Sequence, residues 1–301
     1  MIKIRAYNTA FCSDHFLSFV ERRAKETIRT FALLKEGESV LVAVSGGKDS
    51  LSLWHILKNL GYKSDGLYIH LGIDRYSDIS LEKAVNFAKK IGGKLFVVRL
   101  KEIFEKGIRE LSHTMRRKSC SACGTIKRYI MNRVALEEKY DSLATGHNLD
   151  DEASSLLGNL LYWKEPYLWK KNIALEAEKD RLSRKIKPFF LLSEREIAAY
   201  ALLNGIDYVQ DECPYSVGAK TLLYKEILNR IENESPGTKL NFVKGYLKRV
   251  EKETEDCKEK PSNYCRLCNY PSVGEKCAFC SLLQKINPDG VFKYEKLDFS
   301  L

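Results

Sequence analysis

The stretch Ser39–Leu60, SVLVAVSGGKDSLSLWHILKNL, decides the fold. Its first six residues, Ser39–Val44, form a continuous apolar and β-branched run, which is typical of a strand covered on both faces. Two glycines follow this run, and the pattern from Lys48 to Leu60 predicts a helix. The stretch therefore predicts a strand, a tight turn and a helix, with the turn at the carboxyl end of a buried strand.

The same alternation of strand and helix continues along the chain. Further strands are expected at 65–71, 94–100 and 142–146, and helices at 16–34, 81–91, 102–111, 122–140, 150–161 and 194–204. Such alternation predicts an α/β fold with a parallel sheet, right-handed crossovers and helices on both faces. Ligands of these sheets bind at the carboxyl ends of the strands.

Composition shifts divide the 301 residues into four expected segments. They are an N-terminal segment (1–33), the α/β domain (34–215, closed by 185–190 and the helix 194–204), a basic helical region (216–260) and a cysteine-rich module (261–301). Within the α/β domain, the charged stretch 163–184 is interpreted as a surface excursion.

Composition also sets broad limits on function. With 44% hydrophobic residues the chain is unlike disordered proteins, and it lacks both an apolar run of membrane-spanning length and a signal-peptide pattern. We therefore expect a cytoplasmic protein without a membrane partner. The formal charge of +10 favours a polyanion such as nucleic acid, although basic surfaces can serve solubility alone. In a reducing compartment, the nine cysteines favour metal binding or chemistry over disulfides.

The glycine turn has the residue types of a phosphate site. Two glycines let backbone amides converge, and the start of the following helix adds partial positive charge. The turn matches neither the Walker A nor the Rossmann pattern, and an ordinary β–α turn is the alternative interpretation. Its residues are Ser45, Gly46, Gly47, Lys48, Asp49 and Ser50, in which the serines can add hydroxyl donors and the lysine a cation.

A first cysteine set consists of Cys120, Cys123 and the distant Cys213. A Cys-x-x-Cys pair at a helix start, next to cations, is expected to have lowered thiol pKa values. Three thiolates can hold a [4Fe–4S] cluster and leave one iron open for sulfide. The alternatives are a redox or persulfide pair with Cys213 as partner, or three unrelated buried cysteines.

A second set, Cys265-x-x-Cys268 and Cys277-x-x-Cys280, has the spacing of a closed tetrahedral site. Four thiolates leave no open position, so the site is structural, with Zn²⁺ favoured over a rubredoxin-like iron. Near the N-terminus, Cys12-x-x-His15 lacks a preceding cysteine pair, so its side chains are expected to pack or face solvent. Cys257 is interpreted as incidental.

Four motifs in order resemble a known family over residues 34–215. The turn resembles the pyrophosphate loop of the N-type ATP pyrophosphatases, and the other motifs narrow the likeness to the tRNA 2-thiouridine synthetases. Those motifs are Cys120-x-x-Cys123-Gly124 with Lys127-Arg128, the run Ala144–Glu152 (ATGHNLDDE), and Lys187-Pro188 followed by Cys213-Pro214-Tyr215.

The resemblance implies a fold and roles for individual residues. It implies an adenine-nucleotide alpha-hydrolase-like (PP-loop) domain with a small C-terminal zinc-ribbon module. It also implies cluster binding by the first cysteine set, catalysis by Lys127 and Asp151, and an ATP site that includes Ala43, Ile69 and Gly146. The alternative for Asp150 and Asp151 is a structural role, as a helix cap with an acidic first turn. His70 and His147 also lie at the ends of expected strands, and each is interpreted equally well as a hydrogen-bonded residue that only lines the site.

The implied activity is ATP-dependent 2-thiolation of a tRNA uridine, with ATP, Mg²⁺, a [4Fe–4S] cluster and Zn²⁺. Uridine 54 in the T-loop is favoured; uridine 34, cytidine 32 and a non-catalytic tRNA-binding or sulfur-carrier protein are the alternatives. The sulfur donor is sulfide or a thiocarboxylated ubiquitin-like carrier protein, and a homodimer is consistent with the family.

Basic residues supply candidate tRNA contacts, although any one such run is usually a solvated face. They could form a phosphate-binding stripe, with Tyr246 stacking on an exposed base. The stripe would consist of Arg116, Arg117, Lys118, Lys170, Lys171, Lys244, Lys248 and Arg249.

Overall fold

A computed structural model describes residues 1–168, 173–216, 218, 220–253 and 263–300. In this described part the strands, in chain order, are β1 (Ile2–Ile4), β2 (Thr9–Phe11), β3 (Ser39–Val44), β4 (Lys63–His70), β5 (Lys94–Arg99), β6 (Ser142–Thr145), β7 (Ala174–Leu175), β8 (Arg184–Ile186), β9 (Asn263–Tyr264), β10 (Pro271–Ser272) and β11 (Glu295–Asp298). Lys170, Lys171 and Cys257 lie outside the described residues.

The helices alternate with these strands as the sequence predicts. They are α1 (Ser13–Thr30), α2 (Lys48–Asn59), α3 (Asp74–Ile91), α4 (Leu100–Phe104), α5 (Ile108–Thr114), α6 (Ser119–Glu137), α7 (Leu149–Leu161), α8 (Glu165–Leu168), α9 (Glu194–Leu203), α10 (Lys220–Glu234), α11 (Thr238–Glu253) and α12 (Ala278–Ile286), with a 3-10 turn η1 (Arg5–Tyr7).

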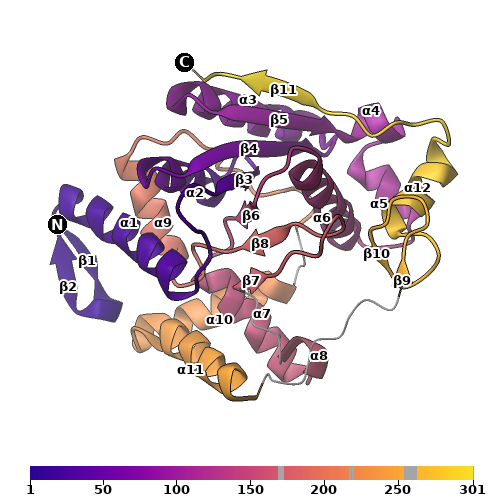
Figure 1. Cartoon of the computed structure of the whole chain (residues 1–301). Coiled ribbons are helices and arrows are strands. Elements are labelled where there is room, and N and C mark those ends of the chain that lie inside the picture. The colour runs from indigo at the N-terminus through magenta and orange to yellow at the C-terminus, as the bar shows by residue number, and fades with distance from the viewer. Residues whose placement is uncertain (169–172, 217, 219, 254–262, 301) are drawn as a thin grey trace.

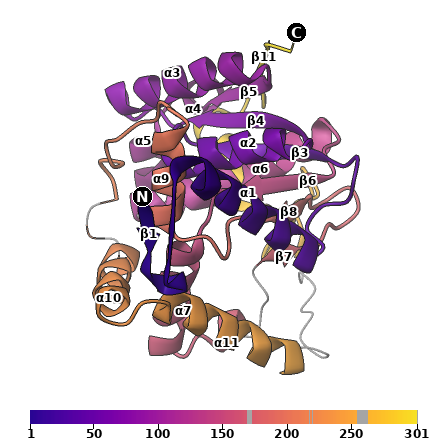
Figure 2. The same cartoon turned by 90° about the vertical axis from the view of Figure 1, so that its left-hand side faces the viewer.

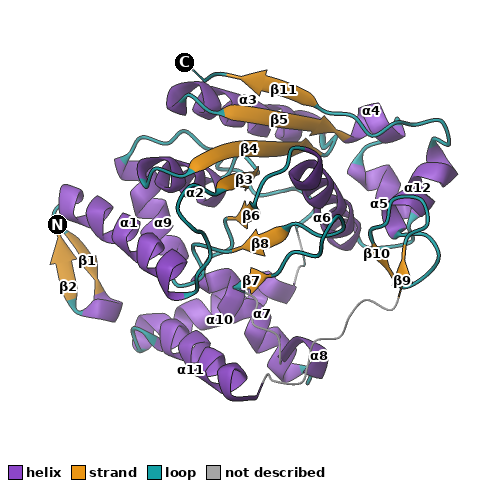
Figure 3. Cartoon of the chain, in the orientation of Figure 1, coloured by secondary structure: helices purple, strands orange, loops and turns teal. Residues whose placement is uncertain are grey.

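The central sheet has the order β11-β5-β4-β3-β6-β8-β7 within the described residues (Figures 1 and 3). Strands β5, β4, β3, β6 and β8 are parallel, which confirms the expected α/β class. The two edge strands, β7 and β11, are antiparallel to their neighbours. The carboxyl ends of β3, β4 and β6 therefore meet at one edge of the sheet, where a ligand site is expected.

Alternate residues of each strand enter two cores, one on each face of the sheet. On β3, Val40, Val42 and Val44 belong to one core, which α1, α2, α3 and α9 cover. Leu41 of β3 and Phe96 of β5 belong to the other core, covered by α4, α5, α6 and α12 (Figure 1). The continuous apolar strands are thus explained by burial on both faces.

Some predicted boundaries are wrong, for local reasons. The helix expected at 102–111 is two helices, because Glu105 adopts a left-handed φ of 59° and Gly107 caps the start of α5. Helix α3 begins at Asp74 instead of residue 81. The surface stretch 163–184 contains α8 and the short edge strand β7.

The cysteine-rich segment is joined to the main sheet, which the sequence did not predict. Strand β11 pairs antiparallel with β5, with Leu297 opposite Leu95. Upstream of β11, Phe279 of α12 stacks on Tyr129 of α6 with ring centroids 3.9 Å apart. These contacts fix the four-cysteine module against the α6 face of the domain.

Helices α10 and α11 lie beside α7 (Figure 2). Leu228 of α10 and Val243 and Leu247 of α11 are buried in the same core as α1 and α9. The basic helical region is therefore packed onto the α/β domain, close to the amino end of α7.

Candidate functional site

The glycine turn joins β3 to α2 and its shape is held by its own serines. The Ser50 hydroxyl accepts a hydrogen bond from the Ser45 amide (3.1 Å) and donates to the Gly47 carbonyl (3.0 Å). Gly46 has a φ of +77°, and a Cβ on it would lie 2.5 Å from the Ser80 carbonyl oxygen. Only glycine fits there, because both the backbone conformation and the neighbouring helix exclude a side chain.

A cavity of about 380 Å³ opens beside this turn, at the carboxyl ends of β3, β4 and β6; we call it the loop cavity. The loop cavity collects residues that the sequence singled out from five separate segments. These are Ala43, Ser45, Asp49, Ser50, Ile69, Cys123, Lys127, Gly146, Asp151 and Cys213. His147 is also part of its wall, whereas His70 is paired with Asp78 at 3.0 Å.

Two of the three cysteines of the first set line the loop cavity. Cys123, in the first turn of α6, and Cys213 line it, while the exposed Cys120 donates its thiol hydrogen to the Tyr215 carbonyl at 3.2 Å. Burial raises the pKa of Cys123, and nearby Cys213 and Cys120 raise it further, against the lowering effect of Lys127. The expectation of a lowered pKa is therefore wrong for Cys123, because desolvation outweighs the helix start and the cations. Two thiols thus line the cavity and the third lies outside its lining. The first set does not form a compact ligand group, because among the described residues the group of three or more candidate ligands whose atoms lie within 4.8 Å of one another is the C-terminal one.

Lys48 of the turn does not point freely into the cavity. Its ammonium contacts Glu194 at 2.7 Å and Asp49 at 3.2 Å. The other Glu194 oxygen lies 3.2 Å from Lys225 of α10, which in turn contacts Asp151 at 2.6 Å. Although burial opposes it, the two ammonium groups hold the pKa of Glu194 below its usual value. A chain of alternating charges thus links the turn to Asp151.

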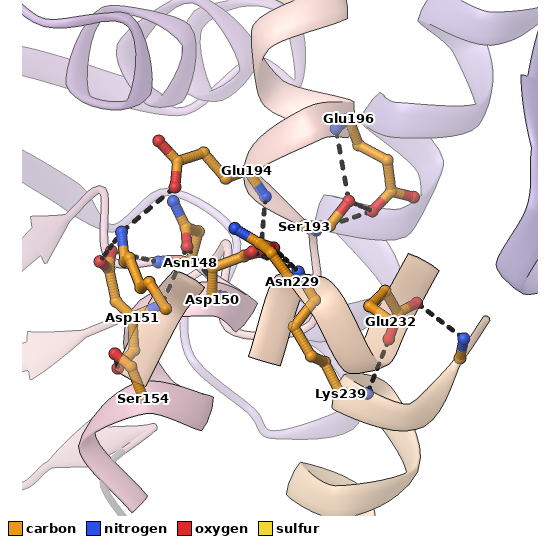
Figure 4. A network of polar contacts seen from close by, with 12 residues as sticks. Asn148, Asp150, Asp151, Ser154, Ser193, Glu194, Glu196, Asn229, Glu232 and Lys239 are labelled. Carbon is orange, nitrogen blue, oxygen red and sulfur yellow. Dashed lines mark hydrogen bonds and ion pairs between the residues drawn. The ribbon is translucent and has the colours of Figure 1, made fainter. Parts of the chain in front are cut away.

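Asp150 and Asp151 have different structural roles (Figure 4). The cap of α7 is Asn148, whose side-chain oxygen accepts from both aspartate amides, while Asp151 accepts from the Asn148 amide at 3.2 Å. Asp150 is buried, forms an ion pair with Lys239 of α11, and accepts from the Glu194 amide at 2.8 Å. Asp150 is therefore not the cap, although it lies in the expected acidic first turn, whereas Asp151 closes the capping box and also lines the loop cavity.

The second cysteine set forms the expected metal-ligand group. The Sγ atoms of Cys265, Cys268, Cys277 and Cys280 all lie within 4.8 Å of one another. Three of the four side chains are buried, and a cluster of thiols without charged partners fits a closed tetrahedral zinc site. At the other end of the chain, Cys12 and His15 are exposed and contact each other at 3.0 Å.

Several cavity residues were missed by the sequence reasoning. Tyr68, Tyr76 and Met131 form an apolar wall, and Thr145 lies at the end of β6. For Tyr68 and Thr145 the available signal was their position near the carboxyl ends of β4 and β6, since the parallel sheet places such residues at the ligand edge. Tyr76 and Met131 come from helices α3 and α6 and carried no such signal. Apolar and aromatic side chains there resemble a core, so their residue types alone gave no indication.

The proposed stripe of basic residues is spread over different elements. Arg116, Arg117 and Lys118 are exposed between α5 and α6, beside Cys120, whereas Lys244 and Lys248 lie on α11 next to α1. Tyr246 packs against the core, and its burial raises the pKa to about 12. Tyr246 is only partly buried, so its stacking on an exposed base stays a prediction. None of the described helices is long and apolar enough to cross a membrane.

Comparisons with known proteins identify the fold and the family of this chain. The family model of the PP-loop domain matches residues 17–218. The structure of the U34-tRNA thiolase NcsA from Methanococcus maripaludis with its [4Fe-4S] cluster superposes with a TM-score of 0.79 at 27% identity, covering 97% of this chain and 94% of that chain. The fold and the glycine turn thus define a PP-loop protein with a mostly parallel sheet.

Curated relatives narrow the assignment. The chain is 47% identical to the tRNA-5-methyluridine(54) 2-sulfurtransferase of Thermus thermophilus, over 93% of this chain and 87% of the relative. It is 47% identical to the protein of the same name from Pyrococcus horikoshii, over 93% and 89%. The chain therefore belongs to the PP-loop tRNA 2-thiouridine synthetase family, and it is a tRNA sulfurtransferase.

Proposed function

We propose that this chain uses ATP to replace the C2 oxygen of a tRNA uridine with sulfur. The observation that carries the proposal is the loop cavity, because its lining includes three residues of the glycine turn, Lys127, Asp151 and two of the three cysteines of the first set. Uridine 54 is favoured as the target, since the relatives at 47% identity are named for that position, while the U34 enzyme matches at 27%.

The residues of the loop cavity divide the chemical work. The turn and Lys48 bind the phosphates of ATP at the start of α2. Adenylation of the uridine oxygen releases pyrophosphate, and AMP leaves when sulfur attacks C2. Lys127 stabilises the charge on the departing AMP, and Asp151 positions Mg²⁺ or moves a proton.

The two cysteine sets have separate roles in this proposal. Cys120, Cys123 and Cys213 hold the [4Fe–4S] cluster, which supplies an iron with an open position for sulfide. Cys265, Cys268, Cys277 and Cys280 hold Zn²⁺ and fix the C-terminal module to α6. The sulfur comes from sulfide or from a thiocarboxylated ubiquitin-like carrier protein. The enzyme is cytoplasmic and can form a homodimer. One relative, from Chlamydomonas reinhardtii, is named Cytoplasmic tRNA 2-thiolation protein 1.

The decisive experiment is nucleoside mass spectrometry of tRNA treated with anaerobically purified protein, ATP and sulfide. We expect 2-thiouridine-type nucleosides, and digestion into oligonucleotides should place them at position 54. Sulfur at position 34 or 32 would support the alternative substrates instead. Binding of tRNA without pyrophosphate release would support a carrier protein.

The cluster assignment has its own test. We expect about four irons and one zinc per chain in the anaerobic protein, on the ligand sets above. Cys213→Ala should abolish thiolation and leave binding of a non-hydrolysable ATP analogue intact. The matched control is Cys12→Ala, an exposed cysteine at the start of α1, which should retain thiolation. An iron-free protein that still thiolates tRNA would contradict the assignment.

A further inference from the structure

Asp151 stands between two cavities. Besides the loop cavity there is a second space of about 360 Å³ between α7 and α10, which we call the α7–α10 cavity. His147 and Asp151 belong to the linings of both. A ligand in the α7–α10 cavity would therefore reach the loop cavity beside the Asp151 carboxylate, to which the proposed function assigns a catalytic role.

The two cavities offer different chemistry. The loop cavity has an apolar and aromatic wall that includes Tyr68, Tyr76 and Met131, which suits a nucleobase. The described lining of the α7–α10 cavity is mostly polar and contains two carboxylates, Asp151 and Glu152, as well as the ammonium groups of Lys187 and Lys225. Hydroxyl groups, among them that of Thr221, complete the polar lining. Ammonium and hydroxyl groups are the usual partners of phosphate and ribose in nucleic-acid complexes.

Both lysines are held in place before any ligand binds. Lys187 contacts Glu152 at 2.7 Å, and Lys225 contacts Asp151 at 2.6 Å and Glu194 at 3.2 Å. An ammonium group has three N–H donors, so these carboxylates leave a donor on each lysine for a further acceptor. Since the side chains are already ordered, a phosphate that binds them loses little conformational entropy.

We propose that the α7–α10 cavity binds a phosphodiester next to the target uridine, so that the base reaches past Asp151 into the loop cavity. Lys187 and Lys225 donate to the phosphate, and Thr221 lies at the rim. This inference rests on the proposed function, because it assigns the backbone of the same tRNA substrate to the second cavity. An enzyme that acts on a paired or stacked base has to extract that base, and a backbone site beside the reaction centre holds the extracted nucleotide.

The most direct test is Thr221→Glu. Thr221 is exposed near the start of α10, where an acidic side chain is compatible with the helix, and none of the ion pairs described above involves it. The added carboxylate should repel a phosphodiester, so we expect about tenfold weaker tRNA binding by fluorescence anisotropy and a similar rise in KM for tRNA. Binding of the ATP analogue should not change.

Lys187→Gln supplies a second, independent readout. Loss of one phosphate contact should reduce the slope of log affinity for tRNA against log salt by about 0.7 to 0.9. Lys63→Gln is the matched control, since Lys63 is exposed at the start of β4, far along the strand from its carboxyl end. Its salt dependence should equal that of the unaltered protein.

The possible failures are distinguishable. Unchanged tRNA affinity and salt slope in both variants of an active enzyme would overturn the inference. Weakened binding of the ATP analogue with unchanged tRNA binding would also overturn it, because the cavity would then hold the triphosphate. Absence of thiolated nucleosides with the unaltered protein would refute the proposed function, while the tRNA-binding measurements would still test the phosphate site.

Discussion

Removal of the Lys239 ammonium should destabilise the protein strongly, because this group neutralises a buried charge. The side chains of Lys239 and Asp150 are only 5% and 4% exposed. Lys239 also donates to Asn229 at 2.8 Å, and the other Asp150 oxygen accepts from the Glu194 amide at 2.8 Å (Figure 4). In Lys239→Met the Asp150 carboxylate stays buried but loses its ion pair. Of the two donors described here, the backbone amide of Glu194 remains.

Breaking a buried ion pair by removing one partner costs about 3–5 kcal/mol. At roughly 2–4 °C per kcal/mol for a chain of this size class, the melting temperature should fall by about 6–20 °C. Urea denaturation followed by far-UV circular dichroism, with the metals retained, measures the free energy of unfolding. The double variant Asp150→Asn, Lys239→Met should recover at least about 2 kcal/mol, because a neutral amide needs no counter-charge and can still accept from the Glu194 amide.

A surface pair of the same residue types provides the control. Lys83 contacts Asp207 at 2.7 Å, but Asp207 is 69% exposed, so Lys83→Met should cost no more than about 1 kcal/mol. If Lys239→Met were also within about 1 kcal/mol of the unaltered protein, the argument that α11 is held through a buried charge pair would be refuted.

Three further changes test other parts of the structure. Gly46→Ala should weaken binding of an ATP analogue in calorimetry by distorting the turn, because its Cβ would meet the Ser80 carbonyl oxygen; unaltered affinity would contradict this. Burial, with a contribution from Arg128, lowers the pKa of Lys185 to about 8, so its charged form destabilises the folded state below pH 8. Lys185→Met should thus raise the melting temperature at pH 7, and this gain should shrink as the pH rises from about 8 towards 10.5; a gain that is independent of pH would be inconsistent. Cys277→Ser should lower both zinc content by mass spectrometry and the melting temperature, with loss of the β11 edge protection in hydrogen exchange.

Much of the sheet could be predicted because its signals are local. The strand Ser39–Val44 was predicted with its observed bounds, since burial on both faces requires a continuous apolar run. The turn after it was found because glycine serves a backbone conformation that other residues avoid, as the φ of Gly46 shows. By contrast, β11 (EKLD) is short and charged, and only its pairing with β5 makes it a strand.

Several of the residues expected at the site share the loop cavity, but the electrostatics of that cavity were not predicted. The spacing of the cysteines indicated the two cysteine sets, and the resemblance implied Lys127 and Asp151; Cys123, Cys213, Lys127 and Asp151 line one cavity. Spacing gives no information on Glu194 of α9 and Lys225 of α10, which meet Lys48 and Asp151 only in the folded chain. The lowered pKa expected for the Cys-x-x-Cys pair failed at Cys123 for the same reason, because burial depends on the packing of distant segments.

The order of charges from Lys48 to Asp151 has a consequence for ligand binding. Glu194 contacts Lys48 through one oxygen and Lys225 through the other. A triphosphate at the turn competes with Glu194 for the Lys48 ammonium, and a half-buried carboxylate left without a cation would oppose that exchange. Because Lys225 stays beside Glu194, the carboxylate keeps a counter-charge when Lys48 turns towards phosphate. Lys225 of α10 also contacts Asp151. Helix α10 is therefore linked both to the glycine turn, through Glu194 and Lys48, and to Asp151 in the loop cavity. Displacement of α10 would thus change the surroundings of Lys48 and Asp151 together.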